Sequence, residues 1–391
     1  MTPGPPQHDE GRAERLRRVL PQIVVVAWLP LCVGFAMVNR EWLPPKYFFD
    51  GDQIEVEMGV ATGPSTNSFI TMAWIYRSVG LAHNATLVAA VTMLAFVALL
   101  LVCARWSDLP RLSLIEIGAF CFAAAAAAVY LAQYSKEGLI LVLVGLLVLL
   151  PRHVAAELVF VAAACLYAAG VRPYWFMVVA LYIALRVVLH VGRRPWMVPA
   201  LLVLAMFGFA IAVAVLMGGD LDQFRSDVNQ ARANSDLAQT LIPTFVPGSG
   251  PLIGGLNGLV SLAILVVPVP LLLDPSPIYL GFAVVIACLW VLLVPVVRRG
   301  MVQGWFRRDV PLARAMALLI AMLTVQAVFE PDYGSYIKHL TPLLPLFLLV
   351  YARARAWRGA TGTGPGRSGN GVPRGVEAGH DGRFATHHGG P

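Results

Sequence analysis

The segment 329–347 reads FEPDYGSYIKHLTPLLPLF and places four ionisable side chains between two apolar stretches: Glu330, Asp332, Lys338 and His339. Charged groups beside a membrane-spanning segment are costly unless water or a partner stabilises them, so they mark a functional site by default. A lysine offers a point charge to an anion, and a histidine titrates near neutral pH and can move a proton. The segment therefore predicts an anion-binding site with acid–base capacity.

Two other loops carry side chains suited to the same chemistry. Asp52 and Glu55 lie three residues apart, so a helix would place both carboxylates on one face, as a general base or simply as solvated loop residues. Arg172 stands before a proline and is followed by Tyr174. A guanidinium held in this way suits phosphate, although Arg, Tyr and Trp also form belts at membrane interfaces.

Two further pairs extend this set of polar residues. Lys136 and Glu137 open a later apolar run and are predicted either to contact substrate or to form an ion pair at the mouth of the spans. Arg225 and Arg232 project from one side of a segment with helical spacing, 221–241. That pattern predicts a helix that lies on the membrane surface or covers an anionic lipid head.

The composition restricts the fold class. Of the 391 residues, 58% are hydrophobic and 13% are charged, with a mean hydropathy of +0.72. Soluble domains carry about 25% charged residues, so the chain is predicted to be an all-α polytopic membrane protein. The net charge of +7 reflects arginines in short loops and predicts a cytoplasmic face rather than nucleic-acid binding. The sequence has neither a P-loop nor cysteines at metal-ligand spacing, so no cofactor or metal is expected.

Runs of roughly 20 apolar residues, the length of a membrane span, recur along the chain and predict about ten transmembrane helices. The basic segment 1–20 is expected in the cytoplasm, and the membrane domain covers 21–351. The tail 352–391 is rich in Gly and Arg and is expected to be disordered in the cytoplasm. Two long outer loops follow from this order, 39–83, with a short helix within it, and 218–251.

The apolar segment 252–273 is predicted to be re-entrant, entering and leaving from the outer face. If it crossed the membrane, Arg298 and Arg299 would lie outside, against the positive-inside rule. Glycines and prolines that suit an interrupted, protein-buried segment occur at Gly254, Gly255, Gly258, Pro268 and Pro270.

With this topology the polar loops described above lie at the same outer face. Three ionisable residues fall instead inside predicted spans, near their cytoplasmic ends: Glu116, Glu157 and Arg186. These are predicted to pair or to reach for the interface, because an unpaired charge within the membrane is costly. The one-sided distribution predicts an active centre that opens to the periplasm or cell exterior.

Four motifs resemble the Wzy-type polymerases of O-antigen, capsule and exopolysaccharide assembly: LPPKYFFDGDQI, SKEG, RPYW and EPDYGSYIKHLTPLLP. The likeness extends over most of residues 40–350, and the last motif is the most specific. Relatives often carry Arg-His before a span that contains proline. Lys338 stands in the place of that arginine, which keeps the charge but loses bidentate phosphate geometry and so favours Arg172 as the phosphate ligand.

The resemblance implies a membrane-embedded glycosyltransferase, similar to the GT-C class, in the bacterial plasma membrane. Such an enzyme joins polyprenyl-diphosphate-linked oligosaccharide repeat units at the outer face. Transfer needs a base for the acceptor hydroxyl and cations for the departing diphosphate. The expected catalytic residues are Arg172, Asp52, Glu55 and His339. The expected substrate-binding residues are Lys136, Glu137, Tyr174, Arg225, Arg232, Glu330 and Lys338.

The expected partners are the lipid-linked oligosaccharide and membrane lipid, together with a chain-length regulator and a repeat-unit flippase. Three other functions fit parts of the pattern. A single-addition transferase would use a polyprenyl-phosphate sugar, with Asp50 or Asp52 as its base, and a polysaccharide ligase would move glycan to a different acceptor. A lipid-linked glycan transporter or flippase is supported by the interrupted segment 252–273, because discontinuous helices often form transport sites.

Overall fold

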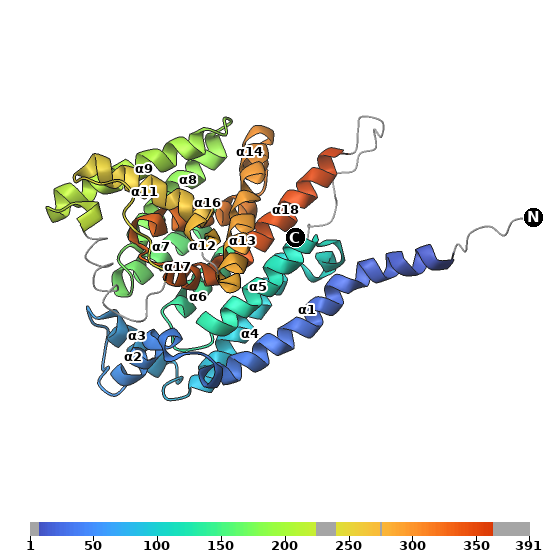
Figure 1. Cartoon of the computed structure of the whole chain (residues 1–391), viewed down its shortest axis with the longest axis horizontal. Coiled ribbons are helices and arrows are strands. Elements are labelled where there is room, and N and C mark those ends of the chain that lie inside the picture. The colour runs from blue at the N-terminus through green and yellow to red at the C-terminus, as the bar shows by residue number, and fades with distance from the viewer. Residues whose placement is uncertain (1–7, 224–239, 274–275, 363–391) are drawn as a thin grey trace, which may run out of the picture.

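The computed structural model describes residues 8–223, 240–273 and 276–362, which form helices connected by short loops (Figure 1). Within these ranges, extended pairing is limited to a bridge between Leu241 and Asp332. Six of the described helical segments are long and apolar enough to cross a membrane: Val19–Trp42, Ala85–Ala104, Met197–Leu216, Tyr279–Gln303, Val310–Phe329 and Tyr333–Gly359. Five shorter apolar helices accompany them: Leu114–Tyr130, Glu137–Leu149, Val154–Gly170, Trp175–Val191 and Pro251–Val266. The prediction of an all-α membrane protein is therefore confirmed, whereas ten spans, the outer loops and the cytoplasmic termini stay predictions.

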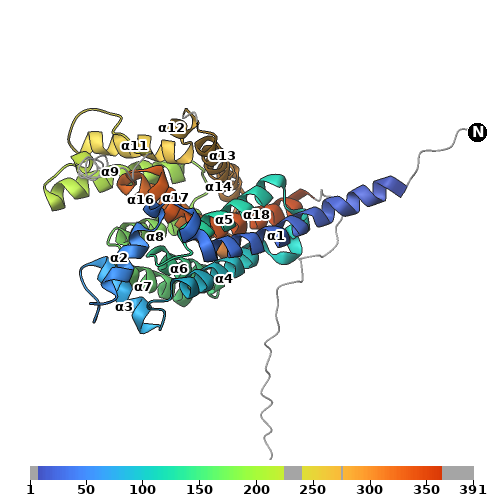
Figure 2. The same ribbon diagram turned by 60° about the horizontal axis from the view of Figure 1, so that its bottom comes forward.

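The first helix, α1 (His8–Trp42), runs along one edge of the molecule and extends beyond its neighbours (Figures 1 and 2). Apolar side chains such as Ile23 and Leu31 are exposed along it. A helix that is apolar on its outer surface as well as its inner one is typical of a membrane span.

A short helical arm follows α1. It consists of η1 (Pro45–Tyr47), α2 (Phe49–Glu57) and α3 (Ser68–Ser78). The Asn67 side chain caps α3 by accepting a hydrogen bond from the backbone N–H of Phe69 at 2.9 Å, which satisfies one of the free donors of the first turn. The predicted short helix in this loop is thus confirmed.

Helices α4 (Ala85–Ala104), α5 (Leu114–Tyr130) and α18 (Leu344–Gly362) pack against one another, and α1 packs against α4 and α5. The alanine run of α5 is largely buried in this packing. Small side chains let helix backbones approach closely, which is how membrane helices gain most of their contact energy.

Helix α16 (Val310–Phe329) lies at the centre of the molecule, where every residue from 311 to 328 is buried. It packs against α18 and, on its other sides, against α6 (Glu137–Leu149) and α8 (Trp175–Val191). The antiparallel neighbour of α8 is α7 (Val154–Gly170). Because protein rather than lipid surrounds α16, it can carry polar residues that a lipid-facing span would not tolerate.

The ionisable residues within the spans are paired. Glu116 forms an ion pair with Arg355, and Glu157 binds Arg186 at 2.7 Å and Arg314 at 2.6 Å. Arg314 is only 2% exposed. The prediction that these charges pair is confirmed, with partners that the sequence pattern did not identify.

The remaining helical elements are η2 (Trp106–Arg111), α9 (Met197–Met217), α12 (Val269–Leu272), α13 (Pro277–Val291), α14 (Leu293–Gln303), α15 (Trp305–Arg308) and η3 (Thr341–Leu343). The predicted re-entrant segment forms α11 (Pro251–Val266) and α12, with the interruption at Pro268. Its glycines do not break the helix. A Cβ on Gly255 would lie 2.4 Å from the ring of Phe207 on α9, so this glycine allows α9 and α11 to approach closely.

The polar motif near the end of the chain forms α17 (Tyr333–Leu340). Asp332 caps this helix by accepting a hydrogen bond from the backbone N–H of Ser335 at 2.8 Å. The backbone N–H of Tyr333 donates to the carbonyl of Thr240 at 3.1 Å. These contacts fix the start of α17 against the loop that precedes α11.

Candidate functional site

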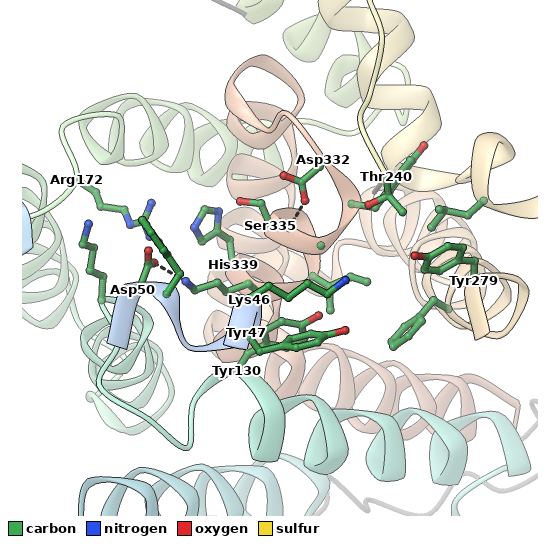
Figure 3. Close-up of a pocket in the computed structure, with 18 of the residues that line it drawn as sticks. Lys46, Tyr47, Asp50, Tyr130, Arg172, Thr240, Tyr279, Asp332, Ser335 and His339 are labelled. Carbon is green, nitrogen blue, oxygen red and sulfur yellow. Dashed lines mark hydrogen bonds and ion pairs between the residues drawn. The ribbon is translucent and has the colours of Figure 1, made fainter. Parts of the chain in front are cut away.

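A cavity of about 620 Å³ lies where α2, α17 and the starts of α6 and α8 meet. Four cationic side chains line it: Lys46, Lys136, Arg172 and Lys338. The carboxylates of the lining are Asp50 and Asp332. His339 adds a titratable ring, and Figure 3 shows Arg172, Asp50 and His339 together at one end. The lining therefore carries an excess of positive charge, which favours an anionic ligand.

Arg172 is held by a buried chain of polar side chains. Its Nη2 contacts Oε1 of Glu137 at 2.5 Å, and Nε2 of His339 lies 3.2 Å from the same oxygen. Nδ1 of His339 contacts Oε1 of Glu330 in turn. Glu137 is fully buried, so its negative charge depends on the charge of Arg172 and on the contact with His339. The two glutamates, which do not line the cavity themselves, thus orient the side chains of Arg172 and His339, which do.

Asp50 and Lys338 form an ion pair within the cavity, although 288 positions separate them in the chain. Burial is the largest single influence and would raise the pKa of Asp50, but the charge and hydrogen bond of Lys338, together with the charge of Lys136, hold this pKa below its usual range. Asp50 is therefore ionised at neutral pH and can accept both hydrogen bonds and a proton.

Gly51 determines how closely α2 approaches the loop before α6. A Cβ at this position would lie 3.0 Å from Oε1 of Gln133 and 3.2 Å from the carbonyl oxygen of Tyr134. The amide of Gln133 also donates to the carbonyl of Tyr47 at 3.0 Å. Because these contacts bring α2 against this loop, Asp50 lies near Lys136.

Lys136 is buried above the ring of Phe69, with Nζ 3.3 Å from the ring centroid. Among the described residues its ammonium forms no hydrogen bond and no ion pair, although Asp50 and Glu137 are close enough to stabilise its charge. Burial first, and then the neighbouring Arg172, lower the pKa of Lys136 to about 8. A buried cation without a bonded anion is costly to the fold, and an anionic ligand would supply what it lacks.

The pKa of Lys136 gives a testable pH dependence. Lys136 is charged well below pH 8 and loses its proton as the pH rises through about 8. We expect the affinity for a short prenyl diphosphate to be full at pH 6.5–7 and to fall severalfold by pH 9. The expected size of this fall follows from the roughly 1 kcal/mol that one charged lysine contributes to binding an anionic head group. In Lys136→Met we expect weaker binding at pH 7 and little of this decline. Titration calorimetry at several pH values measures both, and an equal decline in the variant would exclude Lys136 as its source.

The opposite end of the cavity is aromatic. Figure 3 shows Tyr279 on α13 at this end, with Tyr47 and Tyr130 between it and Arg172, and with Lys46 beside the tyrosines. The rings of Tyr47 and Tyr130 lie 6.0 Å apart. Phe282 also lines this region. Aromatic faces with polar edges bury apolar ligand surface while offering a hydrogen-bond partner, so the two ends of the cavity suit different parts of one elongated ligand.

The structure brings most of the predicted site residues together. Lys136, Arg172, Lys338 and His339 line the cavity. Glu137 and Glu330 lie directly behind them, and Tyr174 stacks on Phe329, with 5.9 Å between ring centroids. The predicted meeting of polar loops from distant parts of the chain is therefore seen in the geometry, while the role of each residue stays a prediction.

Asp52 and Glu55 lie elsewhere. They share one face of α2, as their spacing predicts, but they contact Arg40 at 3.0 Å and 3.6 Å and are not among the residues that line the cavity. Asp52 is half exposed. Arg225 and Arg232 fall in 224–239, outside the described residues, so their predicted lid is not assessed.

Three lining residues carry little signal in the sequence. The sequence pattern offers Asp50 only as an alternative base and predicts no separate role for Lys46 or Asp332. The signal for Asp50 was its position two residues before Asp52 in FDGDQI, which turns it to a different face of the helix.

Within the described parts of the chain, no group of three or more His, Cys, Asp or Glu side chains is placed to hold a metal ion. The lysine and arginine side chains of the lining are suited to binding a phosphate group. The chain matches no family model, no curated protein and no solved structure.

Proposed function

We propose that the protein is a polysaccharide polymerase that joins polyprenyl-diphosphate-linked oligosaccharide repeat units. The observation that carries the proposal is the cavity that combines four cations, an ionised carboxylate and an aromatic end. The cations fit a diphosphate, and the aromatic end fits the faces of sugar rings. The motif resemblance described above points to the same class of reaction.

The cations would act on the leaving group. Arg172 is oriented by Glu137, and Lys136 and Lys338 line the same cavity. Charge accumulates on the diphosphate as its bond to the sugar breaks, so cations fixed beforehand stabilise the transition state more than the ground state. Lys136, which has no bonded anion in the described structure, gains most from this charge.

The acceptor would be activated by a carboxylate. The hydroxyl oxygen of the acceptor sugar attacks C1 of the donor sugar, and its proton passes to Asp50. The bond between C1 and the diphosphate oxygen breaks, and the diphosphate departs with both electrons of that bond. Asp50 is preferred over Asp52 and Glu55 as the base because it lies in the cavity, within reach of a bound substrate.

The proposal also assigns a membrane and a face. The cavity lies at the ends of the helices that the positive-inside rule directs outward. We place the protein in a bacterial plasma membrane with ten spans, both termini in the cytoplasm and the cavity open to the periplasm or cell exterior. In this arrangement α11 and α12 together form the re-entrant segment.

The test is reconstitution. The purified full chain, in nanodiscs, is incubated with one defined repeat unit on a polyprenyl diphosphate, and the products are separated by size. A ladder of products, each longer by one repeat unit, is the expected result. Heat-inactivated protein and a donor with a single phosphate serve as controls.

The same assay separates the alternatives. Addition of one sugar from a polyprenyl-phosphate donor would indicate a single-addition transferase. Transfer of glycan to an added lipid acceptor without chain growth would indicate a ligase. Movement of the lipid across liposomes without any covalent change would indicate a flippase, and each of these results would overturn the polymerase.

A further inference from the structure

A second cavity, of about 370 Å³, lies at the other ends of α7, α8 and α16. Helix α7 runs from this cavity at Val154 toward Arg172, and α16 runs from it at Val310 toward Glu330. At 1.5 Å per residue, helices of this length span roughly 25–30 Å. The two cavities are therefore separated by about the thickness of a bilayer core.

The second cavity is also basic. The cationic or titratable side chains in its lining are Arg152, His153, Arg186, His190 and Arg314, and its carboxylate is Glu157. Both carboxylate oxygens of Glu157 already accept hydrogen bonds. Oε1 accepts from Tyr182 at 2.6 Å and from Arg186 at 2.7 Å, and Oε2 accepts from Arg314. The lining thus keeps an excess of positive charge after its own carboxylate has been used.

Arg314, which is buried, and Arg186, whose side chain is 18% exposed, differ in how fully they are bonded. Arg314 also donates to the carbonyls of Leu150 and Pro151, at 3.1 and 3.0 Å, which gives all three of its nitrogens a partner. Nη1 of Arg186 is buried and, among the described residues, has no hydrogen-bond partner. An arginine that merely reached for water would expose this nitrogen, whereas here an unpartnered donor belongs to a side chain that lines the cavity.

The rim of the cavity is apolar and exposed. Val154, Val187 and Val191 are 76%, 56% and 65% exposed, and Ile183 is 46% exposed; all four line the cavity. At the end of a membrane helix such side chains meet acyl chains, while the arginines lie at the depth of the lipid head groups. A ligand that fits both surfaces has a phosphate head and hydrocarbon chains.

We infer that this cavity binds the phosphate of an anionic phospholipid, with Arg152 and Arg186 as its ligands and the lipid chains against α7 and α8. The site is distinct from the substrate cavity, since the two lie at opposite ends of the same helices. The inference does not depend on the proposed function, because binding can be measured without any reaction.

The test uses the full chain, purified and depleted of lipid in detergent. Binding of phosphatidylglycerol, and of phosphatidylcholine with the same acyl chains, is titrated by native mass spectrometry, with thermal shift as a second readout. We expect a saturable phosphatidylglycerol adduct and no saturable phosphatidylcholine adduct. Arg152→Gln should weaken phosphatidylglycerol binding roughly fivefold, the change expected when one arginine near an anionic head group is removed.

Two variants keep the test specific. Arg194→Gln removes an exposed arginine in the loop after α8 that is not part of the cavity lining, and it should change the affinity less than about twofold. Arg186→Lys keeps the charge beside Glu157 but removes the free Nη1 donor, and it should weaken binding as Arg152→Gln does. Equal affinities in Arg152→Gln and Arg194→Gln would overturn the site. Inorganic phosphate that stabilises the protein as well as the lipid does would show a soluble anion instead and would overturn the lipid assignment.

Discussion

Asp50→Asn is expected to reduce repeat-unit transfer by at least about 100-fold, the contribution typical of a general base. Binding of the donor should be retained or tightened, because the substitution removes a negative charge from a cavity built of cations. It also frees the ammonium of Lys338, the ion-pair partner of Asp50. The rate is measured as product ladder formed per unit time, and the affinity by calorimetry with farnesyl diphosphate.

Asp52→Asn is the discriminating comparison for this result. Asp52 lies on the same helix, two residues away, but pairs with Arg40 at the surface and does not line the cavity. Its loss should leave the transfer rate within a few-fold of the unmodified protein, as for most exposed ion pairs. If Asp52→Asn were inactive and Asp50→Asn active, the base would lie on the other face of α2 and the proposed orientation of substrate would be wrong.

Arg172→Ala is expected to have two separate effects, loss of polymer and loss of protein. Glu137 is fully buried and its shortest contact is with Arg172, so removing the guanidinium leaves an undercompensated buried charge. Breaking such a pair costs about 3–5 kcal/mol. We therefore expect less protein in the membrane, measured by quantitative immunoblot, and no detectable product ladder.

The double variant Glu137→Gln/Arg172→Ala separates the two effects. The neutral glutamine removes the buried charge, so protein abundance should recover, whereas polymerisation should not. Arg172→Lys tests geometry alone: it should accumulate normally and lose at least about tenfold in rate, because a lysine cannot bind a phosphate through two nitrogens. Polymerisation at the normal rate by the double variant would reduce Arg172 to a structural partner of Glu137.

Local pattern was sufficient to predict the helices and that polar loops from distant parts of the chain meet. Apolar runs of span length predict helices well because a lipid environment leaves the backbone few alternatives. The positive-inside rule then directed the loops that carry Lys136, Arg172 and Lys338 to one side, and the structure places these side chains around one cavity.

The local sequence pattern does not predict which charged residues pair with one another. Asp50 and Asp52 differ little in sequence context, yet Asp50 pairs with Lys338 on α17 and Asp52 pairs with Arg40 on α1. These partners depend on how α2 packs against the loop before α6, which in turn depends on the missing side chain of Gly51. A contact between residues 288 positions apart cannot be derived from spacing along the chain.

The glycines of 252–273 show a different limit of prediction from sequence. Glycine both weakens a helix and lets another helix approach, and the sequence does not distinguish these effects. In the structure α11 continues through Gly254, Gly255 and Gly258, and only Pro268 interrupts it. Proline lacks the N–H that a helix needs, so it was the more reliable of the two signals.

The burial of α16 has a consequence for biogenesis. Translation proceeds from the N-terminus, so α16 enters the membrane before its packing partner α18 has been made. A segment that carries Arg314 and Gln326 is poorly suited to lipid on its own. Until α18 is made, α16 can pack against α6 and α8, but the side that α18 covers stays open. A nascent chain that stops before Leu344 therefore presents quality-control proteases with a central helix that is only partly packed.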